Sequence, residues 1–184
     1  MSDNADTAAT EKIRKRLKNK ALHYLERYAS TEAKLAETLK RFAIRKLSQY
    51  SAADIEPHIA YTVSQCVSLG YIDDEAFAQT KWDSGLRSGR SPQWLAQKLR
   101  LAGIHNDIIS ALREAEAEDP DSELRAAIIS ARKRRIGPFA RVIPTEFADK
   151  QKHMARLVRA GFSLSIARHV MAFESPDAAE DYQS

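Results

Sequence analysis

The side chains that most often catalyse reactions or bind metals are few in this chain and lie far apart. A single cysteine, Cys66, can form no internal disulfide, and its place in an apolar stripe indicates a small core residue. Glycine-rich phosphate-binding motifs and the GxSxG motif of hydrolases are both missing from the sequence. The histidines fit no zinc-ligand spacing: His23, His58, His105, His153 and His169. We therefore expect a protein that is not an enzyme and has no catalytic residue, metal site or cofactor.

The acidic run Asp73–Glu75 comes closest to a metal-binding sequence. Carboxylates at the start of a helix also accept hydrogen bonds from free backbone N–H groups and interact favourably with the helix dipole. Because an amphipathic segment follows directly, we interpret these residues as a helix cap.

Lysine and arginine side chains give the clearest chemical signal, which is the binding of a polyanion. There are 29 of them against 25 Asp and Glu, a net charge of +4, and they cluster at Lys12–Lys20 and Arg132–Arg135. Each phosphate neutralised by such a side chain releases counterions, so this binding would be salt-sensitive and largely independent of base sequence. An acidic protein groove would suit the same cations, and the target stays open between the two. Arg132–Arg135 could also be a solvated helix end, because cations there offset the helix dipole.

Further cations recur near equivalent positions of successive predicted helices, where they could form a stripe. On this charge pattern we predict that ten residues contact the partner: Arg87, Arg90, Lys98, Arg100, Arg132, Lys133, Arg134, Arg135, Arg156 and Arg159.

The elements that position these side chains are predicted to be helices throughout. Apolar residues recur at helical spacing in three rounds, with helix-start signals at Ser30 or Thr31, at Pro57, at Asp73 or Asp74, and at Ser91-Pro92. The nearest candidate for a strand, Ala140–Pro144, is short and ends in proline. The fold class is therefore all-α.

One sequence pattern occurs twice, as LRLAGIHNDIISAL at Leu99–Leu112 and LVRAGFSLSIARHV at Leu157–Val170, with Gly103 and Gly161 58 positions apart. Each copy is the junction between the second and third helices of a three-helix, helix-turn-helix-like module, and a weaker copy precedes them. A module this small buries little apolar surface alone. We therefore expect three modules to stack in tandem into an elongated, curved body, whose long surface suits a long partner.

The predicted domain boundaries follow these rounds of helices. Residues 1–11 form a disordered tail, residues 12–70, 71–118 and 119–173 form the three helical repeats, and residues 174–184 form a frayed acidic tail. No run of about 18 apolar residues and no signal-peptide stretch is present, so we expect a cytoplasmic protein without membrane contact.

A three-helix unit also suggests a helix-turn-helix that reads base edges. The helix after Gly103 opens with Asn106 and Asp107, and the Asp107 carboxylate would repel phosphates, so we do not expect base-specific reading. Trp82 and Trp94 fall on predicted apolar stripes. We expect both in the core rather than as platforms for stacking bases.

The centre of the chain resembles the RecX family of bacterial recombination regulators. GYIDDEAFAQ at Gly70–Gln79, followed by RSGRSPQWLAQKLRLAGI at Arg87–Ile104, carries the most specific likeness. Many members have Gly-Pro where this chain has Gly89-Arg90-Ser91-Pro92, which leaves Arg90 as an extra cation.

The flanking parts are similar to the same family. ALHYLERYASTEAKLAETLKR at Ala21–Arg41 resembles its N-terminal repeat, and ISARKRRIGPF at Ile129–Phe139 and RLVRAGFSLSIARHV at Arg156–Val170 resemble its C-terminal part. The likeness extends over about Lys20–Phe173, which is most of the chain.

The resemblance implies a non-enzymatic regulator of recombinational DNA repair and the SOS response. Such a protein would bind the RecA recombinase filament in its helical groove, modulate or inhibit strand exchange and ATP hydrolysis, and in some members also contact single- or double-stranded DNA. The ten predicted cations would then touch the filament, its DNA or both. The alternative is a sequence-nonspecific DNA-binding protein that acts independently of RecA, and a helical scaffold is a third class. We expect a monomer in a bacterial cytoplasm.

Overall fold

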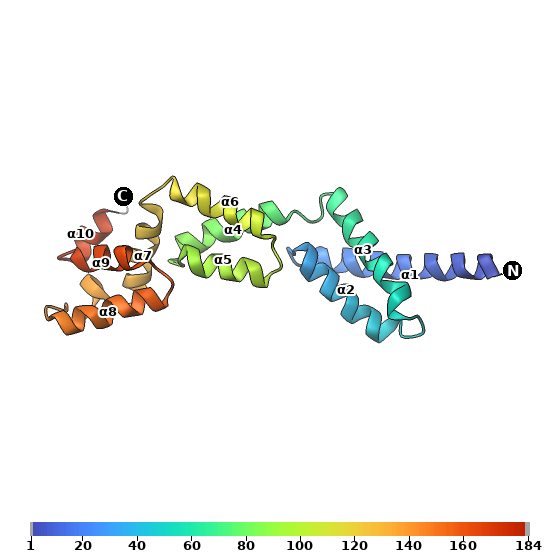
Figure 1. Ribbon diagram of the computed structural model, residues 1–184, viewed down its shortest axis with the longest axis horizontal. Coiled ribbons are helices and arrows are strands. Elements are labelled where there is room, and N and C mark those ends of the chain that lie inside the picture. Colours follow the sequence, from blue (N-terminus) through green and yellow to red (C-terminus); the bar gives the residue numbers. More distant parts are fainter. Residues whose placement is uncertain (1, 183–184) are drawn as a thin grey trace. The chain divides into compact units, whose positions relative to one another are not determined.

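Helices account for nearly all regular structure, as the apolar spacing predicts. The computed structural model describes residues 2–182, with side chains from residue 9 onward, and within this range it holds no strand (Figure 1). The elements are α1 (Ser2–Leu25), α2 (Glu32–Lys46), α3 (Ala52–Ser68), α4 (Asp74–Arg87), α5 (Pro92–Leu101), α6 (Asn106–Ala117), α7 (Ser122–Arg134), the 3-10 helix η1 (Gly137–Phe139), α8 (Phe147–Arg159), α9 (Leu164–Ala172) and α10 (Pro176–Asp181). The all-α fold of tandem three-helix repeats is confirmed, since each predicted repeat holds three α-helices, with the short η1 as an addition in the third.

Two compact units divide the chain. The first comprises Met1–Phe77 with Ala102–Ile104, and the second comprises Ala78–Leu101 with His105–Ser184. The second and third predicted repeats therefore fall largely within one unit, and the exact repeat boundaries stay a prediction.

Hydroxyl and carboxylate caps set the starts of several helices where they were expected. The Thr31 hydroxyl accepts a hydrogen bond from the backbone N–H of Lys34 (3.2 Å), and Asp73 Oδ1 accepts one from Ala76 (2.8 Å). The Ser91 hydroxyl accepts the N–H of Trp94 (3.2 Å). Each bond satisfies a backbone donor that has no partner within the helix, which confirms these caps.

Helix α3 begins earlier than the sequence analysis predicts. Ser51 and Asp54 form a reciprocal capping box, in which each side chain accepts the backbone N–H of the other residue. The helix therefore starts at Ala52, and Pro57, the predicted start, lies inside it.

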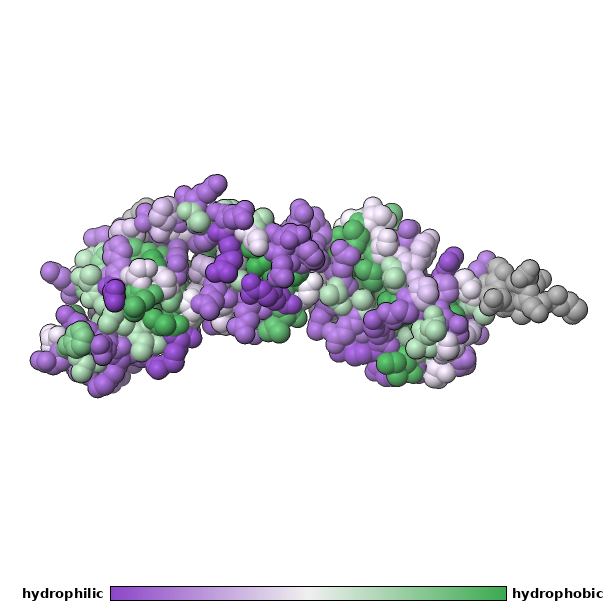
Figure 2. All heavy atoms as spheres, viewed as in Figure 1, coloured by the Kyte–Doolittle hydropathy of each residue, from purple (hydrophilic) through white to green (hydrophobic). Residues whose placement is uncertain are grey.

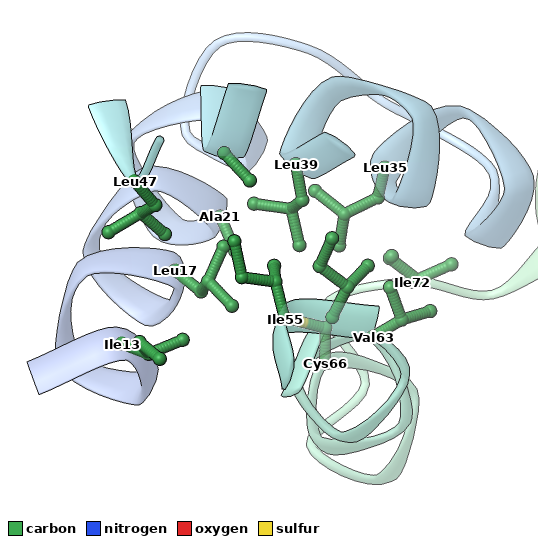
Figure 3. Packing of buried hydrophobic residues seen from close by; sticks show 12 residues of the cluster. Ile13, Leu17, Ala21, Leu35, Leu39, Leu47, Ile55, Val63, Cys66 and Ile72 are labelled. Atoms are coloured by element: carbon green, nitrogen blue, oxygen red, sulfur yellow. The ribbon is translucent and has the colours of Figure 1, made fainter. Parts of the chain in front are cut away.

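The core of the first unit is formed by α1, α2 and α3, whose apolar faces meet at Leu17, Leu35 and Leu39 (Figure 3). Cys66 is 5% exposed and belongs to this core, as expected. Ile72, just after α3, packs against the same cluster. Tyr28 and Val67 continue the apolar spacing of the sequence around α1 and α3, but they are exposed, since Tyr28 lies beyond the end of α1 and Val67 lies in the last turn of α3.

Both predicted tails contain helix. Residues 2–11, expected to be disordered, form the start of α1. Residues 176–181 of the expected acidic tail form α10, where Ala179 is fully buried. The Tyr182 hydroxyl donates to Asp121 Oδ1 (2.6 Å), and its ring packs edge-on against His169 and Phe173. These long-range contacts hold a segment whose composition alone predicts fraying.

The repeated Ala-Gly turns dock on helix caps in the same way at two places. The Thr31 hydroxyl donates to the Ala102 carbonyl (2.6 Å), and the Ser91 hydroxyl donates to the Ala160 carbonyl (2.7 Å). Gly103 and Gly161, the next residues, have φ of +82° and +92°. A Cβ would lie 2.2 Å from Ala33 Cβ at Gly103 and 2.5 Å from Ser91 Oγ at Gly161, so both the backbone angle and the space favour glycine.

Candidate binding surface

All ten cations predicted to contact a partner belong to the second unit. Nine are exposed, and Arg156 is half-buried. They come from the C-terminal ends of α4, α5, α7 and α8 and from the turn after α4, where the partial negative charge of free helix carbonyls stabilises cations. Hydrophilic side chains cover most of the face in Figure 2, with small hydrophobic patches between them.

The ends of α4 and α7 lie against each other. Lys133 Nζ donates to the Ser88 carbonyl (2.9 Å), and Gly89 approaches α7 so closely that a Cβ there would lie 2.8 Å from the Ser130 nitrogen. This contact places Arg87 and Arg90, which flank Ser88 and Gly89, beside the cations that end α7.

The ends of α7 and α8 are joined through a cation. Arg156 Nη2 donates to the Arg134 carbonyl (2.7 Å), which is one of the carbonyls left free where α7 ends. Arg135 then closes α7 in the left-handed conformation, with φ of 52°. Arg156 therefore has a structural role in addition to its charge.

Trp94 on α5 lies between two predicted contact residues. The guanidinium carbon of Arg90 is 4.5 Å from the centre of the Trp94 ring, and Lys98 Nζ is 5.3 Å from it. These distances are typical of cation–π interactions. The expectation that Trp94 lies in the core is wrong, because the ring is half-exposed, whereas Trp82 is 2% exposed as expected.

A local signal could have revealed this arrangement. Lys98 stands four residues after Trp94 in the helix predicted to start at Ser91-Pro92, and residues four apart lie on the same face of a helix. Arg90 stands just before the start of that helix. The buried face of α5 is formed by Leu95, Ala96 and Leu99, so the helix packs against the core without Trp94.

The N-terminal end of α5 lies beside the turn after α8. The Ser91–Ala160 hydrogen bond fixes this contact, and a Cβ at Gly161 would lie 3.5 Å from the Trp94 nitrogen. Arg159, the residue before Ala160, is therefore near Arg90 and Trp94. These hydrogen bonds and cation–π contacts thus connect four segments that carry predicted cations: residues 87–90, 94–98, 132–135 and 156–159.

Two of the ten cations, Arg100 and Arg132, have polar partners outside the four linked groups. Arg100 lies near the C-terminal end of α5, where its Nε donates to Asn106 Oδ1 (3.3 Å). Arg132 forms an ion pair with Glu180 of α10 (3.3 Å), so an acidic residue of the C-terminal segment partly neutralises its charge.

Below, "the basic surface" means the eight remaining cations together with Trp94: Arg87, Arg90, Lys98, Lys133, Arg134, Arg135, Arg156 and Arg159. This surface can attract phosphates or carboxylates and offers one aromatic ring, that of Trp94, beside Arg90 and Lys98.

Other chemistry finds little support in the part of the chain that the structure describes. No group of three His, Cys, Asp or Glu side chains there could hold a metal ion. The acidic run acts in capping and packing: Asp74 Oδ1 accepts the backbone N–H of Glu32 (3.0 Å), and burial raises the pKa of this carboxyl. In a search of the same residues, no helix has the length and apolar character to cross a membrane.

Known proteins with similar sequences share one name. Residues 73–112 match the model of the second three-helix domain of RecX. The Regulatory protein RecX of Myxococcus xanthus (strain DK1622) is 40% identical over 157 residues, which cover 84% of this chain and 83% of that protein. The chain belongs to the RecX family. The RecX protein of Agrobacterium fabrum (strain C58 / ATCC 33970) is 34% identical over 163 residues, covering 89% of this chain and 85% of the relative.

Solved RecX structures share the fold. RecX from Lactobacillus salivarius superposes with a TM-score of 0.68 at 16% identity, over 88% of this chain and 96% of that one. A second crystal structure of regulatory protein RecX gives a TM-score of 0.71 at 22% identity, over 92% of this chain and 77% of the other. The matched domain, 73–112, lies within the second predicted repeat and contains Arg87, Arg90 and Lys98 of the basic surface. The RecX relatives are named as regulatory proteins, which supports a regulator role for this chain.

Proposed function

We propose that this protein binds the RecA recombinase filament in its helical groove and thereby modulates or inhibits strand exchange and ATP hydrolysis in recombinational DNA repair. Membership of the RecX family supports a regulatory role. The observation that supports the proposal is the basic surface, where hydrogen bonds link the cationic ends of α4, α5, α7 and α8, and where Arg90 and Lys98 lie against Trp94.

Two physical properties of such a filament suit a basic surface: its negative charge and its repeated subunits. A filament that coats DNA combines phosphates with repeated protein subunits, so a partner with several contact points binds each further subunit in an intramolecular step. Electrostatic attraction speeds the encounter, and the aromatic ring and the arginines can make closer contacts once docked. A ligand in the groove would obstruct the movement of DNA or favour one filament state over another.

The test reverses three exposed cations of the basic surface, in the variant Arg90→Glu, Lys98→Glu and Arg159→Glu. Binding to RecA filaments at low salt should weaken about tenfold or more, because three attractive charges become repulsive, while the thermal unfolding midpoint stays nearly unchanged. The control variant Arg27→Glu, Arg45→Glu and Lys46→Glu makes the same charge change on exposed residues of the first unit. RecA ATP hydrolysis, measured with each protein, reports the regulatory effect.

Bare DNA distinguishes the alternatives. Binding to single- and double-stranded DNA is titrated with salt beside binding to RecA filaments. Equal affinity for bare DNA and filament would favour a nonspecific DNA-binding protein that acts without RecA, and binding to neither would favour a scaffold. Filament binding that the basic-surface variant leaves unaltered would remove this surface from the mechanism.

A further inference from the structure

A groove on the first unit, separate from the basic surface, is formed by α1 and α3 with the residues that follow α3. Its volume is about 340 Å³, at the lower end of the range of roughly 300–1,000 Å³ seen for small-ligand sites. Thr62 and Cys66, both buried, lie at its base, and Leu69 and Tyr71 lie beside it. Figure 3 shows the core side of the same helix pair, with Cys66 on α3 and Leu17 on α1.

The charge of this groove is entirely positive. Arg14, Lys15 and Lys18 of α1 line it, and no carboxylate is among its ten lining residues. All three cations are exposed, and none forms an ion pair with a carboxylate in residues 9–182. Burial raises the pKa of the Cys66 thiol, which keeps the base of the groove uncharged. The groove therefore attracts an anion without an internal competitor.

Two exposed tyrosines give the groove a second kind of contact. Tyr61 and Tyr71 are 49% and 55% exposed. The guanidinium of Arg14 lies over the Tyr61 ring, 4.9 Å from its centre, and its Nε donates to His58 Nδ1 (3.4 Å). Nucleobases stack on both aromatic rings and guanidinium planes, so the exposed tyrosine rings and the Arg14 guanidinium can each receive an unpaired base.

We propose that this groove binds a short stretch of single-stranded nucleic acid, with its phosphates at Lys15 and Lys18 and unstacked bases against Tyr71 and the Arg14–Tyr61 pair. Lys15 and Lys18 are three residues apart on one helix and so lie on the same face, where they can follow a strand along α1. A double helix hides its base faces, so it would leave the exposed tyrosine rings unused. An acidic peptide would satisfy the cations but would make no use of the exposed rings. The inference concerns a different unit from the basic surface and does not depend on RecA.

Stacking is tested with labelled oligothymidine and the full chain, by fluorescence anisotropy without RecA. Tyr71→Ala should weaken binding about fivefold or more, as expected when one stacked base loses its platform, and Tyr71→Phe should restore it. Tyr28→Ala is the matched control, because Tyr28 belongs to the same unit, is 57% exposed and lies outside the groove. Circular dichroism verifies that each variant keeps its helices.

The charge contribution is tested separately by salt titration. Lys15→Gln with Lys18→Gln should reduce the slope of log affinity against log salt by about 1.4, since each phosphate contact on a single strand contributes about 0.7. Arg45→Gln with Lys46→Gln, on exposed positions of α2, removes the same charge away from the groove and should leave the slope nearly unchanged.

Three results would overturn the proposal. The first is that Tyr71→Ala binds oligothymidine like the unaltered protein, and the second is that the two double variants have equal slopes. The third is that a polyglutamate peptide displaces the oligonucleotide and binds independently of Tyr71. The last result would assign the groove to an acidic protein segment. Each outcome is independent of filament binding, so it leaves the proposal for the basic surface untouched.

Discussion

The ring of Trp94 contacts cations on two sides, whereas the ring of Trp82 is enclosed by the protein and its Nε1 donates to Glu116 Oε2 (3.1 Å). Both residues occupy apolar-looking positions in the sequence. The difference arises because the contacts of α5 are already filled by leucines and an alanine, so Trp94 is left at the edge. A residue type therefore sets what a side chain can bind, and its neighbours decide what it does bind.

His153 gives a prediction at the scale of one residue. Its Nδ1 accepts the backbone N–H of Gly137 (2.9 Å), which requires that this nitrogen carry no proton. Burial, followed by the nearby Arg156 charge, lowers the pKa of His153 below the ordinary value of about 6.5, although Asp149 opposes the shift.

Because its pKa is lowered in the folded state, His153 should make stability depend on pH. The unfolded chain takes up the proton first as the pH falls through about 6.5, so the free energy of unfolding should decrease from there down to the pKa of the folded state. Urea denaturation at a series of pH values measures this. In His153→Asn, an amide oxygen can accept the same N–H without titrating, and the decrease over this window should become smaller. An equal decrease in both proteins would assign it to other groups.

Some helix-capping side chains also join distant parts of the chain, whereas others stabilise only their own helix. Ser91 both caps α5 and donates to the Ala160 carbonyl, whereas Ser163 caps α9 by accepting the N–H of Ile166 (3.3 Å). The first serine therefore holds two distant elements together, and the second stabilises its own helix.

Replacing each serine by alanine tests this difference. Ser91→Ala should lower the free energy of unfolding by about 2–4 kcal/mol, since it removes a cap and leaves a carbonyl beside a buried site without its donor. Ser163→Ala should cost about 1 kcal/mol, the usual effect of a lost cap. Chemical denaturation of both variants gives the comparison, and equal losses would mean that the bond to Ala160 contributes nothing.

At the scale of the whole molecule, the C-terminal segment places negative charge beside Arg132, one of the ten predicted contact residues. Residues 174–184 carry four carboxylate side chains and no lysine or arginine, and Glu180 pairs with Arg132. The segment is also packed, through Ala179 and Tyr182, onto the core of the second unit.

Truncation after Phe173 should therefore have two opposite effects. It raises the formal net charge, +4 for the whole chain, by four, and frees Arg132, so affinity for RecA filaments at low salt should increase. The thermal midpoint should fall by several degrees, because Ala179 and the Tyr182 ring leave the core. Binding at low and high salt together with thermal unfolding measures both. Unchanged affinity at low salt would show that the segment does not affect the surface.

Much of the fold follows from local sequence. Apolar spacing gave the helices, and capping residues such as Thr31, Asp73 and Ser91 gave several of their starts, because both signals act within one turn of a helix. The predicted start at Pro57 was wrong because the capping box at Ser51 and Asp54 competes with it. The exposure of Tyr28 and Val67 shows that a stripe predicts which side faces inward but not where the partner helix ends.

The sequence by itself determined that the chain is helical and repetitive, that it lacks the spacings of common catalytic and metal sites, and that its charge is clustered and positive. Only the tertiary structure decided which helix ends meet, as in the contacts of Lys133 with Ser88 and of Arg156 with Arg134, and that Glu180 of the acidic segment pairs with Arg132. It alone revealed the groove between α1 and α3. The physical reason is separation along the chain: periodicity and caps involve residues three or four apart, whereas these contacts join residues tens of positions apart and depend on which helix faces pack together.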